Sequence, residues 1–407
     1  MQGSPQGAEL PFELAWRRNL YVCVFGAFTT VLAMTLLLPF LPLYVAELGV
    51  RGRGPIAQWS GITFGATFLA SGLVAPLWGR FADRYGRKLI LVRASLGMAV
   101  CMSLTGMAQT VWQLLALRLL AGFLGGYASG STVLVATQTP RGRSAWALGV
   151  LSSGIMAGGV AGPLLGGMLP PLIGVRRTFF LAGGVIFIAF LATVLLIRET
   201  RPARSHGPQP RAWHQIPDRR AVSVMLLTGT LLTLANMSIE PIVTLYVAQL
   251  MPGTSSVTMM SGLIMAAGAL GSVLAAPPVG RLADRIGHRR VVIACLLASA
   301  LLLLPQALVG QAWQLLVLRF LMGMALAGLS PSITSMIRHA VPARIAGQVL
   351  SLNTSAQYFG FVLGPLLGGF VAARLGMRPV FGITSLLMLA GAGLAATIRV
   401  RDLPPAR

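Results

Sequence analysis

The chain has 407 residues, of which 55% are apolar and only 10% charged, and its mean hydropathy is +0.77. A water-soluble domain of this length would need far more charge on its surface, so the composition excludes that class and predicts membrane spans. The net charge of +23 is carried by short basic clusters between apolar runs, without a contiguous basic domain, so we expect no nucleic-acid partner.

The apolar runs are long enough to cross a bilayer, since a helix needs about 20 apolar residues to span the hydrocarbon. The alternating ten-residue segments of a membrane β-barrel are absent. The first run lacks the cleavage pattern of a signal peptide, so we expect it to remain as a span. The sequence therefore predicts an all-α membrane protein with twelve transmembrane helices, at 20–46, 57–78, 89–109, 113–137, 146–170, 178–197, 221–247, 258–279, 290–309, 312–336, 346–371 and 379–398.

Loop charge predicts the orientation of these spans, because Lys and Arg accumulate in cytoplasmic loops. With the N-terminus inside, 24 of the 32 basic residues fall in cytoplasmic segments, among them Arg93 at the start of the third span. Six fall in external loops, and Arg118 and Arg319 lie within spans. We therefore expect both termini in the cytoplasm. Lys88 is the only Lys among the basic residues, and this dominance of Arg is typical of a GC-rich bacterial genome, so we expect a bacterial inner (plasma) membrane.

The two halves of the chain repeat each other. GRFADRYGRK at 79–88 returns as GRLADRIGHR at 280–289, and WQLLALRLLAG at 112–122 returns as WQLLVLRFLMG at 313–323. A Pro- and Arg-rich stretch lies between the halves and is typical of a linker. The expected domains are a cytoplasmic N-terminus at 1–19, a six-helix bundle at 20–197, a cytoplasmic linker at 198–220, a second six-helix bundle at 221–398 and a cytoplasmic tail at 399–407.

The sequence G-x-x-A-D-R-x-G-R-K after the second span resembles the signature loop of the major facilitator superfamily. Arg118 with Gly122, and the glycine run from Gly154 to Gly167 in the fifth span, resemble further motifs of its twelve-helix drug:proton antiporter branch. The resemblance covers nearly the whole chain. It implies two pseudo-symmetric six-helix bundles and secondary active transport by alternating access.

The signature loops carry charges and glycines. Asp83 lies just before the third span, where its carboxylate can face the positive end of a helix and pair with a nearby arginine. The glycines are expected to permit tight turns. One interpretation is a topological anchor with a helix cap, and the resemblance implies a charge latch that holds one access state. The residues concerned are Gly79, Asp83, Arg84, Gly86, Arg87 and Lys88, repeated as Gly280, Asp284, Arg285 and Gly287.

The fifth and eleventh spans each have a face of small residues. Glycines four apart on one side of a helix let a second helix approach closely, so these faces are expected to meet each other across the halves as a seal or hinge line. Ordinary helix packing is the alternative. The faces consist of Gly154, Gly158, Gly162, Pro163 and Gly166, and of Gly360, Gly364, Pro365 and Gly368.

Glu240 is the one acidic residue of nine that falls within a predicted span. A carboxylate there costs several kcal/mol unless it is neutral or paired, so it is expected to serve a function. It could bind and release a proton or cation, it could form a structural ion pair with Arg319, or it could do neither. Pro241 is expected to kink the seventh span.

Other polar groups within the spans are candidates for the coupling or substrate site. The resemblance implies a coupling or gating role for Arg118, although a buried Arg needs only carbonyls, water or a carboxylate as partners. Helical spacing places Asn236 on the same stripe as Glu240. Asn353 and Gln357, four apart in the eleventh span, could line a cavity or join two helices by hydrogen bonds.

These observations favour a proton-coupled exporter of drug-like lipophilic compounds. A proton-coupled importer of a sugar or other small metabolite is the main alternative, followed by a membrane-embedded enzyme or scaffold. The spans contain no cluster of His with Asp or Cys and the chain has no P-loop, so neither an enzyme, a metal site nor an ATP-driven pump is predicted. We expect no cofactor beyond the proton gradient, a small-molecule substrate, lipid as surroundings and a functional monomer.

Overall fold

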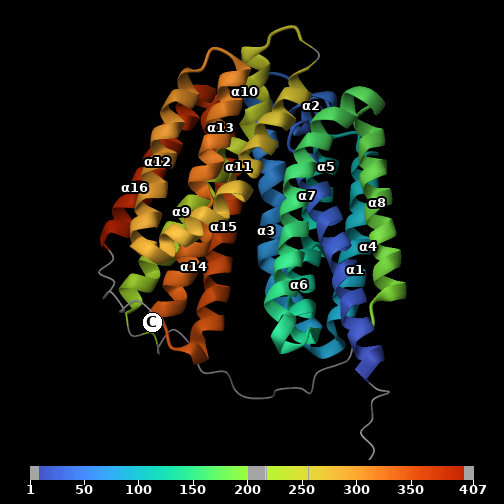
Figure 1. Cartoon of the computed structure of the whole chain (residues 1–407). Helices are drawn as coiled ribbons and strands as arrows, with labels where there is room; N and C mark the ends of the chain where they lie inside the picture. The colour runs from blue at the N-terminus through green and yellow to red at the C-terminus, as the bar shows by residue number, and fades with distance from the viewer. Residues whose placement is uncertain (1–8, 200–215, 217, 255, 398–407) are drawn as a thin grey trace, which may run out of the picture. The chain divides into compact units, whose positions relative to one another are not determined.

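A computed structural model describes residues 9–199, 216, 218–254 and 256–397, with the side chains of 9–14, 83, 141, 343 and 344 left aside. All regular elements in these residues are helical (Figure 1). The helices of the first half are α1 (Glu9–Leu36), α2 (Leu41–Glu47), α3 (Arg53–Tyr85), α4 (Arg87–Thr105), α5 (Val111–Leu124), α6 (Tyr127–Gln138), η1 (Arg141–Arg143), α7 (Ser144–Ile173) and α8 (Val175–Leu196). Those of the second half are α9 (Arg219–Ile239), η3 (Glu240–Ile242), α10 (Val243–Leu250), α11 (Val257–Ile286), α12 (His288–Leu308), α13 (Ala312–Leu326), α14 (Leu329–Ala340), α15 (Ala343–Leu375) and α16 (Met377–Thr397).

Twelve stretches of helix are long and apolar enough to cross a membrane, which confirms the predicted number of spans. Three of these spans are interrupted: α5 and α6 together form span four, α9, η3 and α10 form span seven, and α13 and α14 form span ten. Large apolar side chains such as Leu172, Leu195 and Leu308 are exposed on the helix surfaces. Such surfaces are stable against lipid and not against water, so the chain is a multi-pass membrane protein.

Four pairs of successive spans are joined by one glycine each. Gly86, Gly174, Gly287 and Gly376 have φ between 86° and 102°, a backbone conformation that is strained for residues with a Cβ. The signature loop is therefore almost wholly helical, because α3 continues to Tyr85 and α4 begins at Arg87. The expectation of a turn at Gly79 and at Gly280 is wrong, since these two glycines lie inside α3 and α11.

The helices form two compact units. Unit 1 comprises Met1–Phe40 and Ala70–His206, and unit 2 comprises Leu41–Leu69 and Gly207–Arg407. The first part of α3 belongs to unit 2 because it packs closely on α15. A Cβ on Gly61 would overlap the backbone at Pro365, and the Phe68 and Phe361 rings stack with centroids 4.7 Å apart.

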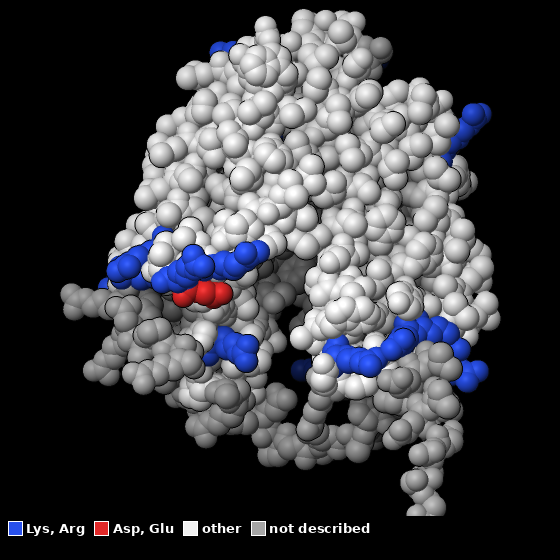
Figure 2. Space-filling model, viewed as in Figure 1, with Lys and Arg blue, Asp and Glu red and all other residues white. Residues whose placement is uncertain are grey.

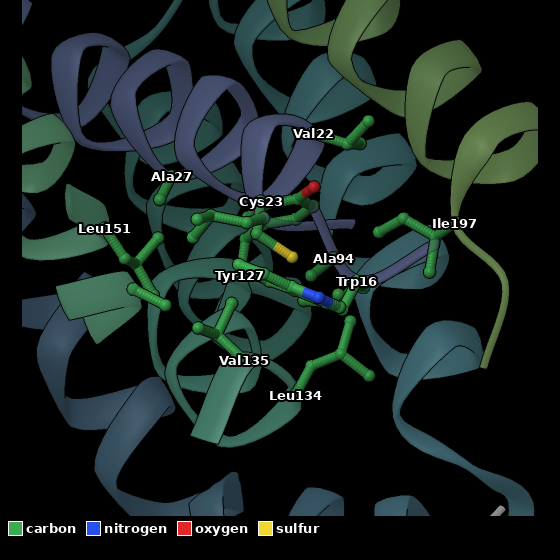
Figure 3. Close-up of a cluster of buried hydrophobic side chains, with 13 residues drawn as sticks. Trp16, Val22, Cys23, Ala27, Ala94, Tyr127, Leu134, Val135, Leu151 and Ile197 are labelled. Atoms are coloured by element: carbon green, nitrogen blue, oxygen red, sulfur yellow. The ribbon is translucent and has the colours of Figure 1, made fainter. Parts of the chain in front are cut away.

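Unit 1 has an apolar core where α1, α4, α6 and α7 converge. Figure 3 shows Trp16, Cys23, Tyr127 and Leu151 among the buried side chains of this cluster. The Tyr127 hydroxyl bonds to Thr193 Oγ1 at 2.7 Å, so its polar atom is satisfied in an apolar setting. Cys23 is a buried free thiol that fills space in this core, as its position in an apolar run predicts.

Candidate functional site

Span seven is broken where its carboxylate lies. α9 ends at Ile239, and Glu240, Pro241 and Ile242 form a 3-10 turn before α10 begins. Pro241 lacks an amide hydrogen and cannot continue the α-helical bonding, so the α-helix is interrupted at the position where a kink is predicted. Glu240 is partly exposed, as is Asn236 one turn earlier on α9. The break presents a carboxylate and an amide on the same side of the span.

Arg319 of α13 is a buried arginine within electrostatic range of Glu240. Arg319 is only 6% exposed, and its Nε and Nη2 are buried without hydrogen-bond partners in the described residues. A guanidinium in this state depends on its counter-charge, because burial of an unpaired charge is costly. No hydrogen bond or ion pair of 4 Å or less joins Glu240 and Arg319 in the described residues, so their ion pair stays a prediction.

Asn353 and Gln357 gather at a different level of unit 2. Asn353 is 4% exposed, and its Oδ1 has no hydrogen-bond partner in the described residues. Asn353 Oδ1 lies 3.2 Å from the position that a Cβ would take on Gly229 of α9. Gln357 Nε2 lies 3.8 Å from that same Cβ position. Gly229 precedes Glu240 by eleven residues, or about 16 Å of helix. These two amides therefore belong to the α9–α15 seam and not to the surroundings of Glu240.

Arg118 occupies the corresponding place in unit 1. It is 3% exposed, and its Nη2 donates to Thr105 Oγ1 at 3.3 Å and to Met102 Sδ at 3.5 Å. Its Nε is buried without a hydrogen-bond partner in the described residues. A coupling role for Arg118 stays a prediction.

A residue that the sequence analysis missed caps the first signature junction. Both carboxylate oxygens of Glu199, which follows α8, accept backbone N–H bonds at the start of α4, from Arg87 at 2.7 Å and from Lys88 at 2.8 Å. Lys88 in turn donates through Nζ to Val194 O at 2.7 Å, at the C-terminal end of α8. Charges of both signs thus satisfy the helix ends they face.

The carboxylate expected at this helix end was that of Asp83. Its side chain lies outside the described residues, so its pairing and its latch role stay predictions. Arg84 lies over the ring of Tyr85, with 5.4 Å from Cζ to the centroid. The sequence offered one weak signal for the Glu199 cap. A glutamate stands directly after the sixth span, and the third span begins just after Gly86 with free backbone amides.

The second signature junction is held by other groups. Asp284 is 75% exposed and lies 3.7 Å from His288 Nε2, which also bonds to Ser335 Oγ of α14 at 2.9 Å. Arg289 donates to the carbonyls of Ala395 and Ala396 at the end of α16, as Lys88 does at the end of α8. The repeated basic residue therefore anchors the last span of each half.

The glycine faces of α7 and α15 are covered by helices of their own units. A Cβ on Gly158 would lie 2.6 Å from Phe28 O of α1, and Gly154, Gly162 and Gly166 face the same helix. A Cβ on Gly360 would lie 2.7 Å from Thr230 O of α9, and Gly364 and Gly368 also face α9. The expectation that the two faces meet each other is wrong, because α1 and α9 already occupy them.

Basic side chains gather at one end of each unit. On the face shown in Figure 2 most Lys and Arg lie toward the end at which α6 is found in unit 1 and α14 in unit 2. In unit 2 this end includes exposed Arg281, Arg285 and Arg290 at the α11–α12 junction, with Asp284 among them. The charge asymmetry that the loops predicted is thus present along the axis of the helices.

Twelve spans with repeated charged junctions and intramembrane ionisable residues define a secondary membrane transporter, not an enzyme. The family model of the Major Facilitator Superfamily matches residues 23–269 and 225–407. The chain belongs to this superfamily, as its signature loops indicate, and it therefore handles a small-molecule substrate.

Curated relatives and solved structures agree with this membership. The chain is 42% identical to Multidrug resistance protein MdtG of Dickeya zeae (strain Ech586), over 93% of each chain, and 42% identical to the protein of that name from Serratia proteamaculans (strain 568), over 94% of each. Among solved structures, the nucleoside transporter NupG superposes with a TM-score of 0.78 at 14% identity, covering 94% of this chain and all of that one. A bacterial homologue of the human lysosomal transporter Spinster gives a TM-score of 0.74 at 15% identity, covering 94% of this chain and 96% of that one. Likeness at this identity supports the fold alone.

Proposed function

We propose that this chain is a proton-coupled exporter of lipophilic, drug-like compounds in a bacterial inner membrane. The observation that carries the proposal is the partly exposed carboxylate of Glu240 at the break of span seven, within electrostatic range of the buried Arg319. The family and the 42% identical MdtG proteins, whose name refers to multidrug resistance, supply the substrate class. Lys and Arg at one end of each unit support a cytoplasmic location for that end and for both termini.

In the proposed cycle, a lipophilic compound enters from the cytoplasmic side and the two halves rock to release it outside. A proton then binds Glu240 and weakens its attraction to Arg319, which lets the carrier return. Loss of that attraction changes the relative energies of two states of span seven, as a coupling mechanism requires. The carrier needs no cofactor and acts as a monomer, because each unit supplies its own ionisable residues.

Transport in everted membrane vesicles tests the proposal. We expect cationic or neutral lipophilic compounds to accumulate in vesicles that carry the wild-type chain when the interior is acidic, and accumulation to stop when the pH gradient is collapsed. Glu240→Gln should abolish the gradient-driven part. Asp218→Asn is the matched control, since that exposed carboxylate caps the start of the same helix through Ala221 N.

Two results would contradict the proposal. Accumulation that survives collapse of the gradient would exclude proton coupling, and full proton-driven export by Glu240→Gln would exclude this carboxylate as the proton site. Uptake of a sugar or other hydrophilic metabolite in the opposite direction would favour the importer.

A further inference from the structure

Span four (Val111–Gln138) breaks near the middle of its length. α5 ends at Leu124, Gly125 is extended, and Gly126 has φ 106° and ψ 18° before α6 begins. A break of this kind leaves backbone carbonyls without intrahelical partners, and a bilayer offers no water to satisfy them. These carbonyls therefore need donors from neighbouring helices.

Three side chains from α3 and α4 supply the donors. Arg93 Nη1 donates to Phe123 O at 3.2 Å and Nη2 to Gly125 O at 2.9 Å. Trp78 Nε1 donates to the same Phe123 O at 2.8 Å, and Ser71 Oγ donates to Gly122 O at 3.0 Å. The guanidinium of Arg93 also lies over the Trp78 ring, 3.6 Å from its centroid. We call Ser71, Trp78 and Arg93 the span-four clamp.

Two of the three residues of the span-four clamp have no counterpart in the second half. Ser71 is matched by Ser272, but the positions equivalent to Trp78 and Arg93 are Val279 and Ala294. There the chain passes from α13 to α14 through Ala327 and Gly328, both in the right-handed helical region. A Cβ on Gly328 would overlap the Val279 side chain, so apolar packing covers that bend. One half thus contains a true break secured by a cation, and the other a mild bend secured by aliphatic groups.

We propose that Arg93 is a positioning residue that fixes the bend of span four, and that Gly125–Gly126 is the hinge about which α6 moves during transport. Arg93 was counted with the cytoplasmic charges from the sequence, yet its side chain bonds to the middle of a neighbouring span. Its rigid, planar fork of donors holds two carbonyls in a fixed geometry, whereas the ammonium of Lys sits on a flexible stem and fixes them less firmly. The cation–π contact with Trp78 adds to these charge-assisted bonds.

Amide hydrogen exchange of the full chain in lipid nanodiscs tests the clamp without reference to transport. We expect Arg93→Met to speed exchange in residues 125–131 at least tenfold, and Arg93→Lys to speed it less. In the Arg93 variants, exchange in residues 327–332 should stay within twofold of wild type. Arg290→Met is the matched control, because it removes an exposed arginine from α12, and its exchange should stay within twofold of wild type throughout the chain. A folded Arg93→Met with exchange in 125–131 within twofold of wild type would overturn the proposal.

Trp78→Phe serves if Arg93→Met does not fold, because it keeps an aromatic ring and removes one donor to Phe123 O. We expect it to speed exchange in 125–131 about threefold, and unchanged exchange would again overturn the clamp.

The hinge rests on the proposed function. For it, Arg93→Lys should lower the maximal export rate at least fivefold while the half-saturating concentration changes less than twofold. An unchanged rate with faster exchange would refute the hinge, and a wild-type chain that exports nothing would refute the proposed function while the exchange result stands.

Discussion

Glu240 lies at the break of span seven, next to Pro241, and the buried Arg319 of the same unit lies within electrostatic range of it without a close ion pair in the described residues. Two nitrogens of that guanidinium have no hydrogen-bond partner in the described part of the chain. A carboxylate and an incompletely satisfied cation beside a broken helix are suited to a change of state, because few bonds must be lost when the carboxylate is neutralised.

A double-mutant cycle should measure the strength of this pair. We expect Glu240→Gln alone to destabilise unit 2 by about 3–5 kcal/mol, because it leaves Arg319 charged and buried without its counter-charge. Glu240→Gln with Arg319→Met should recover most of that loss. Thermal unfolding in detergent reports both effects, and additive losses in the double variant would show that the two residues do not interact.

Substitution by alanine should lower stability at two glycines of the signature loops and raise it at two others. Gly86→Ala and Gly287→Ala force a Cβ into φ of 102° and 97°, which should cost about 1–2 kcal/mol each. Gly79→Ala and Gly280→Ala place a methyl group in open space inside a helix and should stabilise by about 0.5–1 kcal/mol. Melting temperatures of the four variants compare the two classes, and equal effects would contradict the helical assignment of the loop.

The glycine face of α7 should be intolerant of bulk only where α1 covers it. Gly158→Leu would press a side chain into the backbone at Phe28, so we expect loss of export although the protein still inserts into the membrane. Gly159→Leu is the matched control, because a Cβ at that neighbouring position meets no atom within 4 Å. Membrane-fraction immunoblots and vesicle transport measure insertion and export. Comparable export by both variants would show that the packing is not required.

Removal of the Glu199 carboxylate should loosen the first signature junction. Glu199→Gln replaces a charged cap on the Arg87 and Lys88 amides by a neutral one, which should cost about 0.5–2 kcal/mol. Asp284→Asn in the other junction should change stability by less than about 0.5 kcal/mol, because that carboxylate is 75% exposed. Chemical unfolding in mixed micelles compares the free energies of unfolding of the Glu199→Gln and Asp284→Asn variants. Equal losses would imply that the cap contributes no more than a surface charge.

Hydropathy, loop charge and the repeated blocks were sufficient to predict twelve spans, a superfamily and a disturbed helix at Pro241. Each of these follows from local properties, namely the cost of apolar residues in water and of a missing amide hydrogen in a helix. The partners of side chains were harder to predict. Glu199 reaches the amides of Arg87 and Lys88 from more than a hundred residues away, and Arg93 bonds to the backbone of another span.

The sequence by itself determined that the chain is a duplicated membrane transporter, because the length of each apolar run and the repeat of the signature blocks in both halves can be read without knowing any contact. Only the tertiary structure decided that α1 and α9 cover the glycine faces, and that one half secures its broken span with an arginine. Such contacts depend on which helix faces meet and at what level. Hydropathy cannot encode this, since many pairings of apolar helices bury similar areas and differ only in steric fit and in the few polar bonds they complete.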